Sequence, residues 1–263
     1  MLFIIPVKSA IISPSWPRFS KLFERCLKSV CQQTDQDFKV VVVCHEKPDI
    51  EFRHPNIYYH QVQFTPPVPE NDTIIKLTSS AKEADKAKKI LAGIEFGEQF
   101  NRAYAMVVDA DDCISNQIVS FVKNHAAEPG WYFNSGYIYK EGSKVIFKKM
   151  KAFNGLCGTS IIVKTPYLKN IVSSDLYFRH TKCKLDSGIE LQILPFEGAI
   201  YTINNGENHF MTENTVKYLK SGATMPKKSY VRKLVKIFDR ALNYRVWFLN
   251  KSLKQQFGLY QID

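Results

Sequence analysis

An apolar run that ends in a cluster of acids is the feature that most constrains this chain. Residues 104–108 read Tyr-Ala-Met-Val-Val and are followed at once by Asp109, Ala110, Asp111 and Asp112. The run predicts a buried central strand, and α/β proteins bind ligands at the carboxyl ends of such strands. Side chains alternate along an extended chain, so Asp109 and Asp111 point to one side and can offer oxygen ligands to Mg²⁺ or Mn²⁺.

A structural role is the alternative for these acids. An Asp before the amphipathic run at 114–122 could cap a helix, and Asp112 is the residue best placed to do so. One cap needs one carboxylate, whereas three neighbouring carboxylates repel one another. We therefore expect a cation at Asp109 and Asp111.

Strand and helix patterns alternate through the first half of the chain. We expect strands over 2–7, 38–44, 57–63 and 104–109, and helices over 20–34, 82–96 and 114–125. This order predicts an α/β fold with a mainly parallel central sheet flanked by helices. Further on, strands over 132–139 and 144–148 predict a hairpin. A chain of 263 residues fits one catalytic domain with an appendage.

Several classes of protein are disfavoured by what the sequence lacks. The six cysteines form no Cys-x-x-Cys pair, so we expect a reducing compartment. No signal-peptide pattern opens the chain, and no apolar run approaches the ~18 to 20 residues of a spanning helix. A dinucleotide or ATP cradle is disfavoured because no Gly-x-Gly-x-x-Gly or Walker loop occurs. We expect a cytoplasmic protein that meets a membrane, if at all, peripherally at its inner face.

The Asp-Ala-Asp-Asp arrangement resembles the Asp-x-Asp signature of GT-A-fold glycosyltransferases, and its wording is close to that of the family-2-like group. Other segments resemble that family in the same order: 3–9, 22–33, 38–44, 85–93, 153–160 and 205–209. The resemblance implies a GT-A catalytic domain over 1–211, followed by a helical C-terminal extension over 212–263. It also implies metal-dependent, inverting transfer of a sugar from a nucleotide-sugar donor to a hydroxyl acceptor. The expected donor is a UDP-sugar, and the expected process is polysaccharide or glycolipid synthesis.

The same resemblance places the donor against residues that precede the acidic strand. These are Pro6, Val7 and Ser9 at the end of the first strand, and Asp85, Lys86 and Lys89 on the basic helix. The alternative for Pro6, Val7 and Ser9 is that they only form the end of a strand and the start of the loop after it. A solvated basic face is the alternative for the helix and accounts equally well for Lys89.

The resemblance also implies a metal site and a general base. Asp109 would contact the ribose or the cation, and Asp111 and His209 would ligate the cation; a solvated loop histidine is the alternative for His209. Inverting transfer needs a base for the acceptor hydroxyl. We expect Asp186 in that role, with Glu190 four residues later at the start of a short helix, although Asp186 could be an ordinary N-cap. His180 and Asp175 are further candidates.

The charge of the chain is concentrated near its end. Between Lys217 and Lys254, eleven Lys or Arg residues face one acid, Asp239, while the whole chain carries +11. Apolar residues at helical spacing from Val231 to Leu249, with Tyr244, Trp247 and Phe248 nearby, predict a basic amphipathic helix. Such a helix suits an anionic membrane surface carrying lipid-linked acceptors; packing on the catalytic domain is the alternative.

Two other functions compete with glycosyl transfer. A sugar-nucleotide nucleotidyltransferase would carry a Gly-rich, Arg-containing loop after its first strand, and 11–18 holds no glycine. A protein that has lost catalysis could instead bind lipid or nucleic acid through its basic tail. We expect no nucleic-acid partner, and a separable catalytic domain that stays soluble after removal of residues 226–263.

Overall fold

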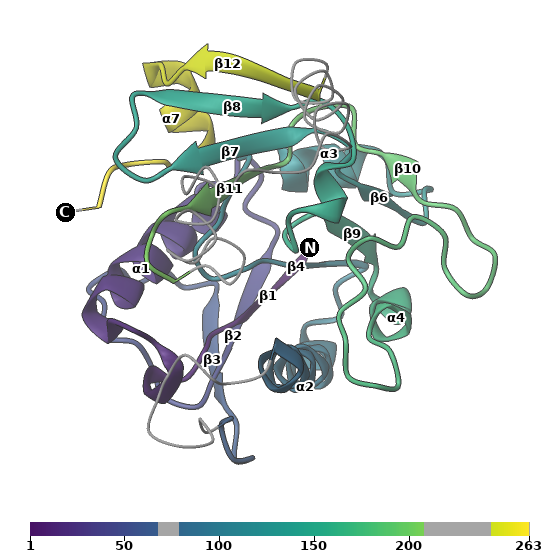
Figure 1. Ribbon diagram of the computed structural model, residues 1–263. Helices are drawn as coiled ribbons and strands as arrows, with labels where there is room; N and C mark the ends of the chain where they lie inside the picture. The colour runs from purple at the N-terminus through teal and green to yellow at the C-terminus, as the bar shows by residue number, and fades with distance from the viewer. Residues whose placement is uncertain (68–78, 208–242, 263) are drawn as a thin grey trace, which may run out of the picture.

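The computed structural model describes residues 1–67, 79–207 and 243–262 of the chain (Figure 1). These residues form two β-sheets with helices packed against them. None of the described helices is long and apolar enough to cross a membrane.

The larger sheet has seven strands in the order β10-β6-β9-β4-β1-β2-β3. Their bounds are Leu2–Pro6 (β1), Lys39–Cys44 (β2), Ile57–Gln61 (β3), Tyr104–Val107 (β4), Gly130–Tyr132 (β6), Ile161–Lys164 (β9) and Gln192–Ile193 (β10). Strands β1 to β4 pair in parallel, as does β10 with β6, whereas β9 runs antiparallel to both of its neighbours. The expected mainly parallel sheet is confirmed.

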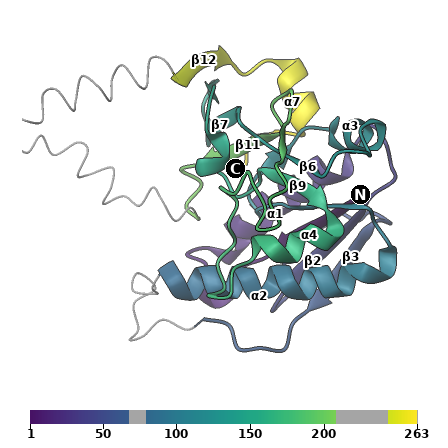
Figure 2. The same ribbon diagram turned by 90° about the vertical axis from the view of Figure 1, so that its right-hand side faces the viewer.

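Both faces of this sheet are buried, which explains why its central strands are apolar without a polar alternation. In β1, Phe3 and Ile5 pack in one core with helix α1 (Trp16–Cys31). Leu2 and Ile4 pack in a second core with helix α2 (Ser79–Gly97). Helix α2 therefore lies along one face of the sheet (Figure 2).

The smaller sheet has five strands in the order β12-β8-β7-β11-β5. They are Cys113–Ile114 (β5), Gly136–Lys140 (β7), Val145–Lys149 (β8), Ala199–Ile203 (β11) and Tyr244–Phe248 (β12). Strands β7 and β8 form the expected hairpin. The described residues also form short helices over Ile118–Asn124 (α3), Thr165–Leu168 (α4) and Lys251–Phe257 (α7), and 3-10 turns over Ala10–Ile12, Glu98–Phe100, Phe153–Gly155 and Lys169–Ile171.

Two predicted elements are wrong in their bounds. The predicted strand at 132–139 is two strands in different sheets, because the chain bends at Asn134 and Ser135 between β6 and β7. The predicted helix at 114–125 begins only at Ile118, because Cys113 and Ile114 pair with β11 instead. Asp112 therefore caps no helix.

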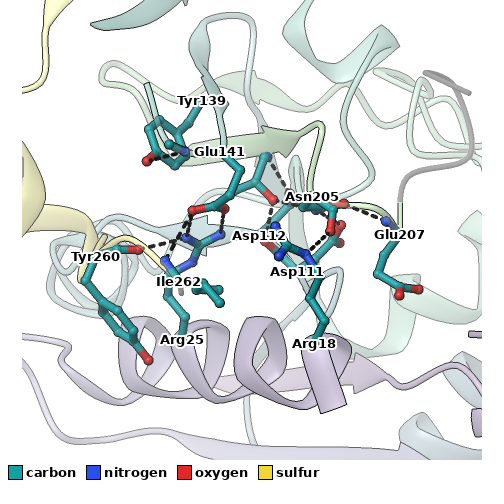
Figure 3. A network of polar contacts seen from close by, with 12 residues as sticks. Arg18, Arg25, Asp111, Asp112, Tyr139, Glu141, Asn205, Glu207, Tyr260 and Ile262 are labelled. Carbon is teal, nitrogen blue, oxygen red and sulfur yellow. Dashed lines mark hydrogen bonds and ion pairs between the residues drawn. The ribbon is translucent and has the colours of Figure 1, made fainter. Parts of the chain in front are cut away.

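The described end of the predicted extension is part of the fold. Strand β12 pairs with β8, and Phe257 and Leu259 are buried against the smaller sheet. Arg25 of α1, fully buried, pairs with Glu141 at 2.9 Å and donates to the carbonyl oxygen of Tyr260 at 2.8 Å (Figure 3). The predicted amphipathic helix is wrong over Tyr244–Phe248, which form strand β12. The rest of that helix and the boundary at 211/212 lie outside the described residues, so the division into domains stays a prediction.

Candidate active site

A cavity of about 390 Å³ lies at the carboxyl ends of β1 and β4, beside the first turns of α2. Parallel strands bring these two ends together, so residues a hundred positions apart share one wall. Of the residues predicted to hold the donor or the metal, seven line this cavity: Pro6, Val7, Asp85, Lys86, Lys89, Asp109 and Asp111.

Asp109 is held from two sides at the end of β4. Its backbone N–H donates to Thr159 Oγ1 at 2.8 Å, and its Oδ1 lies 2.5 Å from Lys86 Nζ. A Cβ added to Gly158 would lie 2.5 Å from Asp109 Oδ2 and 3.0 Å from Lys86 Nζ. Gly158 thus leaves the room that this ion pair occupies, which explains a glycine at this point of the 153–160 segment.

Asp111 is held from the opposite side of the cavity by the segment after β11. Asn205 Nδ2 donates to Asp111 Oδ2 at 2.8 Å, and Arg18 of α1 donates to the Asn205 carbonyl oxygen at 2.8 Å (Figure 3). Burial raises the pKa of Asp111; Lys8 opposes this shift, and the neighbouring Asp109 carboxylate adds to it. A bound cation would favour the charged form of such a carboxylate.

Asp112 has a different environment from the two acids before it. It is fully buried and accepts hydrogen bonds from Thr159 Oγ1 at 2.7 Å, Cys157 Sγ at 3.2 Å and the Thr202 N–H at 3.2 Å. These bonds join the end of β4 to β11 and to the segment that holds Asp109. The role of Asp112 is structural, as the sequence indicated, but it links segments where a helix cap was expected.

Helix α2 supplies basic and acidic side chains to the same cavity. Lys89, only 1% exposed, pairs with Asp85 Oδ2 at 2.6 Å, and the other oxygen of Asp85 lies 2.8 Å from His45 Nε2. Burial lowers the pKa of Lys89, and Asp85 opposes this shift. A solvated basic face is therefore wrong for Lys89, since its ammonium group is buried.

Lys8 and Glu207 form a pair that the sequence analysis missed. Lys8 Nζ lies 2.8 Å from Glu207 Oε2, and buried Glu207 also accepts from Ser13 Oγ at 3.1 Å. Glu207 stands in the same polar turn as Asn205, where only His209 was singled out. The one sequence signal for it was that turn, directly after an apolar strand.

His180 also lines the cavity, on the loop that follows Phe178. Its Nδ1 lies 2.7 Å from the carbonyl oxygen of Asn154. A carbonyl only accepts, so Nδ1 carries the proton and Nε2 is the basic nitrogen of the neutral ring. Burial lowers the pKa of His180, so the ring is neutral at neutral pH.

The remaining predicted residues lie elsewhere. Ser9 is buried and donates to Glu46 Oε1 at 2.9 Å, outside the lining of the cavity. Asp186 and Glu190 are exposed on a turn between paired segments, where a short helix was expected, and neither lines the cavity. Asp186 pairs with Lys182, which holds the pKa of that carboxyl below its usual range. His209 lies outside the described residues.

Asp109 and Asp111 line the same cavity and are the candidate ligands of a divalent cation. Mg²⁺ is usually bound through one or two carboxylates, with substrate phosphates and water completing its shell. Across residues 1–67, 79–207 and 243–262, no group of three His, Cys, Asp or Glu side chains is arranged to hold a metal. The further ligands would come from a diphosphate, from water and from the predicted His209, which lies outside these ranges.

Comparison with known proteins points to one family. The model of the family described as "Putative rhamnosyl transferase" matches residues 15–185. Among solved structures, TarS of S. aureus superposes with a TM-score of 0.45 at 13% identity, covering 77% of this chain and 36% of that one. The structure of TarS residues 1-349 superposes with a TM-score of 0.43 at 13% identity, covering 76% of this chain and 60% of that one.

The chain thus spans about a third of one TarS chain and three fifths of the other. The cytidylyltransferase IspD of Francisella tularensis gives a TM-score of 0.39 at 11% identity, covering 83% of this chain and 98% of that one. No curated protein matches the chain.

Proposed function

Because the chain belongs to this rhamnosyl transferase family and is a glycosyltransferase, we propose that its cavity transfers rhamnose from a nucleoside-diphosphate sugar to a hydroxyl acceptor. One observation carries this proposal. Asp109 and Asp111 line a cavity that also holds three lysines of α2 and Lys8, at the ends of two adjacent parallel strands. Carboxylates for a cation and ammonium groups for phosphates are what a nucleotide diphosphate requires.

On the donor side, Asp109 and Asp111 would hold Mg²⁺ or Mn²⁺, and His209 stays a predicted further ligand. When bound, the cation offsets the charge that builds on the departing diphosphate. In the same cavity Lys86 pairs with Asp109, and Lys8 pairs with Glu207. The two lysines add positive charge to the cavity that the diphosphate would enter. Pro6 and Val7, on the wall formed by β1, would support the base.

On the acceptor side, we assign the role of general base to His180 in place of Asp186. The acceptor oxygen bonds to the anomeric carbon while the bond from that carbon to the diphosphate oxygen breaks. The bonding electrons leave with the diphosphate, and the hydroxyl proton passes to Nε2 of His180. His180 lines the cavity with its other nitrogen held by Asn154, whereas Asp186 lies on an exposed turn.

Binding of a nucleoside diphosphate tests the donor site. Asp111→Asn should leave the melting temperature near that of the parent and abolish Mn²⁺-dependent binding of UDP, measured by calorimetry. The amide keeps the volume of the carboxylate but removes the charge that would hold the cation. Asp49→Asn, at an exposed position outside the cavity, is the matched control. Undiminished Mn²⁺-dependent binding by Asp111→Asn would remove the proposed metal site.

The choice of donor is tested separately. Rhamnose linked to UDP or to dTDP, UDP-glucose and UDP alone can be compared for metal-dependent thermal stabilisation. A ligand at ~100 times its dissociation constant adds ~2.7 kcal/mol to the free energy of unfolding. Stabilisation by UDP-glucose but by neither rhamnose donor would contradict rhamnosyl transfer while leaving the metal site intact.

A further inference from the structure

Strand β12 presents an apolar surface that nothing in the described part of the chain covers. Val246, Trp247 and Phe248 are 65%, 52% and 82% exposed, although they are consecutive residues of one strand. Neighbouring side chains of a strand point to opposite faces, so both faces of β12 are open. Among the described strands β12 pairs only with β8, and it lies at the outer edge of the smaller sheet (Figure 1).

The same edge is strongly basic. Residues 144–151, which contain β8, hold four lysines, and residues 243–257, which contain β12 and α7, hold one arginine and two lysines. Neither segment contains an Asp or a Glu. In the register of the two strands Arg245 lies opposite Lys148, and Lys148 Nζ pairs with Glu197 Oε1 at 2.5 Å.

We infer that β12 docks on a membrane surface with anionic headgroups. Tryptophan and phenylalanine flanked by Lys and Arg are the side chains that enter the boundary between headgroups and acyl chains. Basic residues within a Debye length of such a surface add attraction that salt weakens.

Charge favours an anionic membrane over a second copy of the chain as the partner of β12. Pairing of two β12 edges would bring two basic segments together without an acid between them, whereas anionic headgroups complement them. Nucleic acid also carries negative charge and stacks on aromatic rings. It offers no apolar layer for Val246, however, and Val246 and Phe248 share one face of the strand. The inference does not depend on the sugar or on the donor site.

Vesicle binding of the full chain tests this surface. The chain should bind vesicles of phosphatidylcholine with 30% phosphatidylglycerol at low salt, and much more weakly vesicles of phosphatidylcholine alone. The double variant Trp247→Ser/Phe248→Ser should weaken binding to the anionic vesicles at least tenfold. Ile193→Ser, which removes another exposed apolar side chain from a different sheet edge, is the matched control and should bind as the parent does.

Fluorescence reports where the tryptophan goes. Brominated acyl chains should quench the emission of the bound protein, and Trp247→Phe should remove most of this quenching. Equal melting temperatures of the variants and the parent would show that the exposed side chains are not needed for folding.

Four results would overturn the inference. The first is that the parent does not bind anionic vesicles at low salt. The second is that the double variant binds them as tightly as the parent. The third is that the parent is a dimer which the double variant converts to a monomer. The fourth is that a single-stranded oligonucleotide displaces the vesicles. Loss of UDP binding in Asp111→Asn with vesicle binding unchanged would show that the two surfaces act separately.

Discussion

At the scale of single residues, the cavity depends on one position without a side chain. Gly158 leaves room for the ion pair of Asp109 and Lys86, whose atoms lie 2.5 and 3.0 Å from where a Cβ would be. Gly158→Ala should therefore displace Asp109 and weaken Mn²⁺-dependent UDP binding about tenfold or more, since overpacking costs about 1–3 kcal/mol. Gly155→Ala is the matched control, because Gly155 lines the same cavity and its added methyl meets nothing within 4 Å. Equal affinities of the two variants would show that the close approach has no role.

The assignment of His180 predicts the pH dependence of transfer. Its pKa is lowered by burial, and Lys86 lowers it further, while Asp109 and Glu83 oppose. The basic form is the neutral ring, so the rate should be constant above pH 6.5 and fall as pH drops through the lowered pKa. His180→Gln should cut transfer ~100-fold and remove this acid limb while UDP binding stays near normal. If His180→Gln had normal turnover and an unchanged pH profile, another group would have to be the general base.

At the scale of elements, a buried ion pair joins α1 to the turn that follows β7. Arg25 and Glu141 are 0% and 5% exposed at their side chains. Arg25→Leu should lower the free energy of unfolding by about 3–5 kcal/mol in urea titrations, because it leaves Glu141 buried and unpaired. The double variant Arg25→Leu/Glu141→Leu should recover part of that loss. If the single and the double variant lost equal amounts of unfolding free energy, packing and not charge would explain the effect.

The order of the elements could largely be predicted from the sequence. β1, β2 and β4 are long apolar runs that period and composition identify, and the acids at the end of β4 mark the cavity. The bend at Asn134 and Ser135 could not be predicted, because 132–139 has a strand pattern throughout and the change of sheet depends on partners elsewhere in the chain. The exposed turn at Asp186 has the same cause: a spacing of four residues fits a helix, but Lys184 pairs with Glu190 across the turn.

The positions of residues around the cavity could be predicted where one helix or strand carries them together, and not where a loop carries them. Asp85, Lys86 and Lys89 share one helix face, and helical geometry brings them to the cavity together. Lys8 and Glu207 are 199 positions apart, and only the folded chain pairs them.

At the scale of the whole molecule, the last described residues complete a core. Phe257 is fully buried against Tyr139, Ile146 and Ile200 of the smaller sheet. Phe257→Ala should lower the free energy of unfolding by about 3–5 kcal/mol, while Gln255→Ala on the exposed side of the same helix should leave it nearly unchanged.

Removal of residues 243–263 should give an aggregated or unfolded chain, measured by gel filtration and circular dichroism. This reverses the expectation of a separable domain, because the removed residues include Phe257, Leu259 and the edge strand β12. A truncated chain that stays monomeric and binds UDP would restore that expectation.

The way Asp109 and Asp111 are held has a consequence for the order of folding. Thr159 and Gly158 lie about fifty positions after Asp109, Asn205 lies 94 after Asp111, and Glu207 is joined to Lys8 from the other end of the chain. Contacts of such long sequence separation form slowly, since each requires a large loop to close. A nascent chain that has emerged only through β4 already carries the acidic run but has none of the partners that fix its carboxylates. The proposed catalytic centre is thus assembled late in synthesis, after the strands on which it stands.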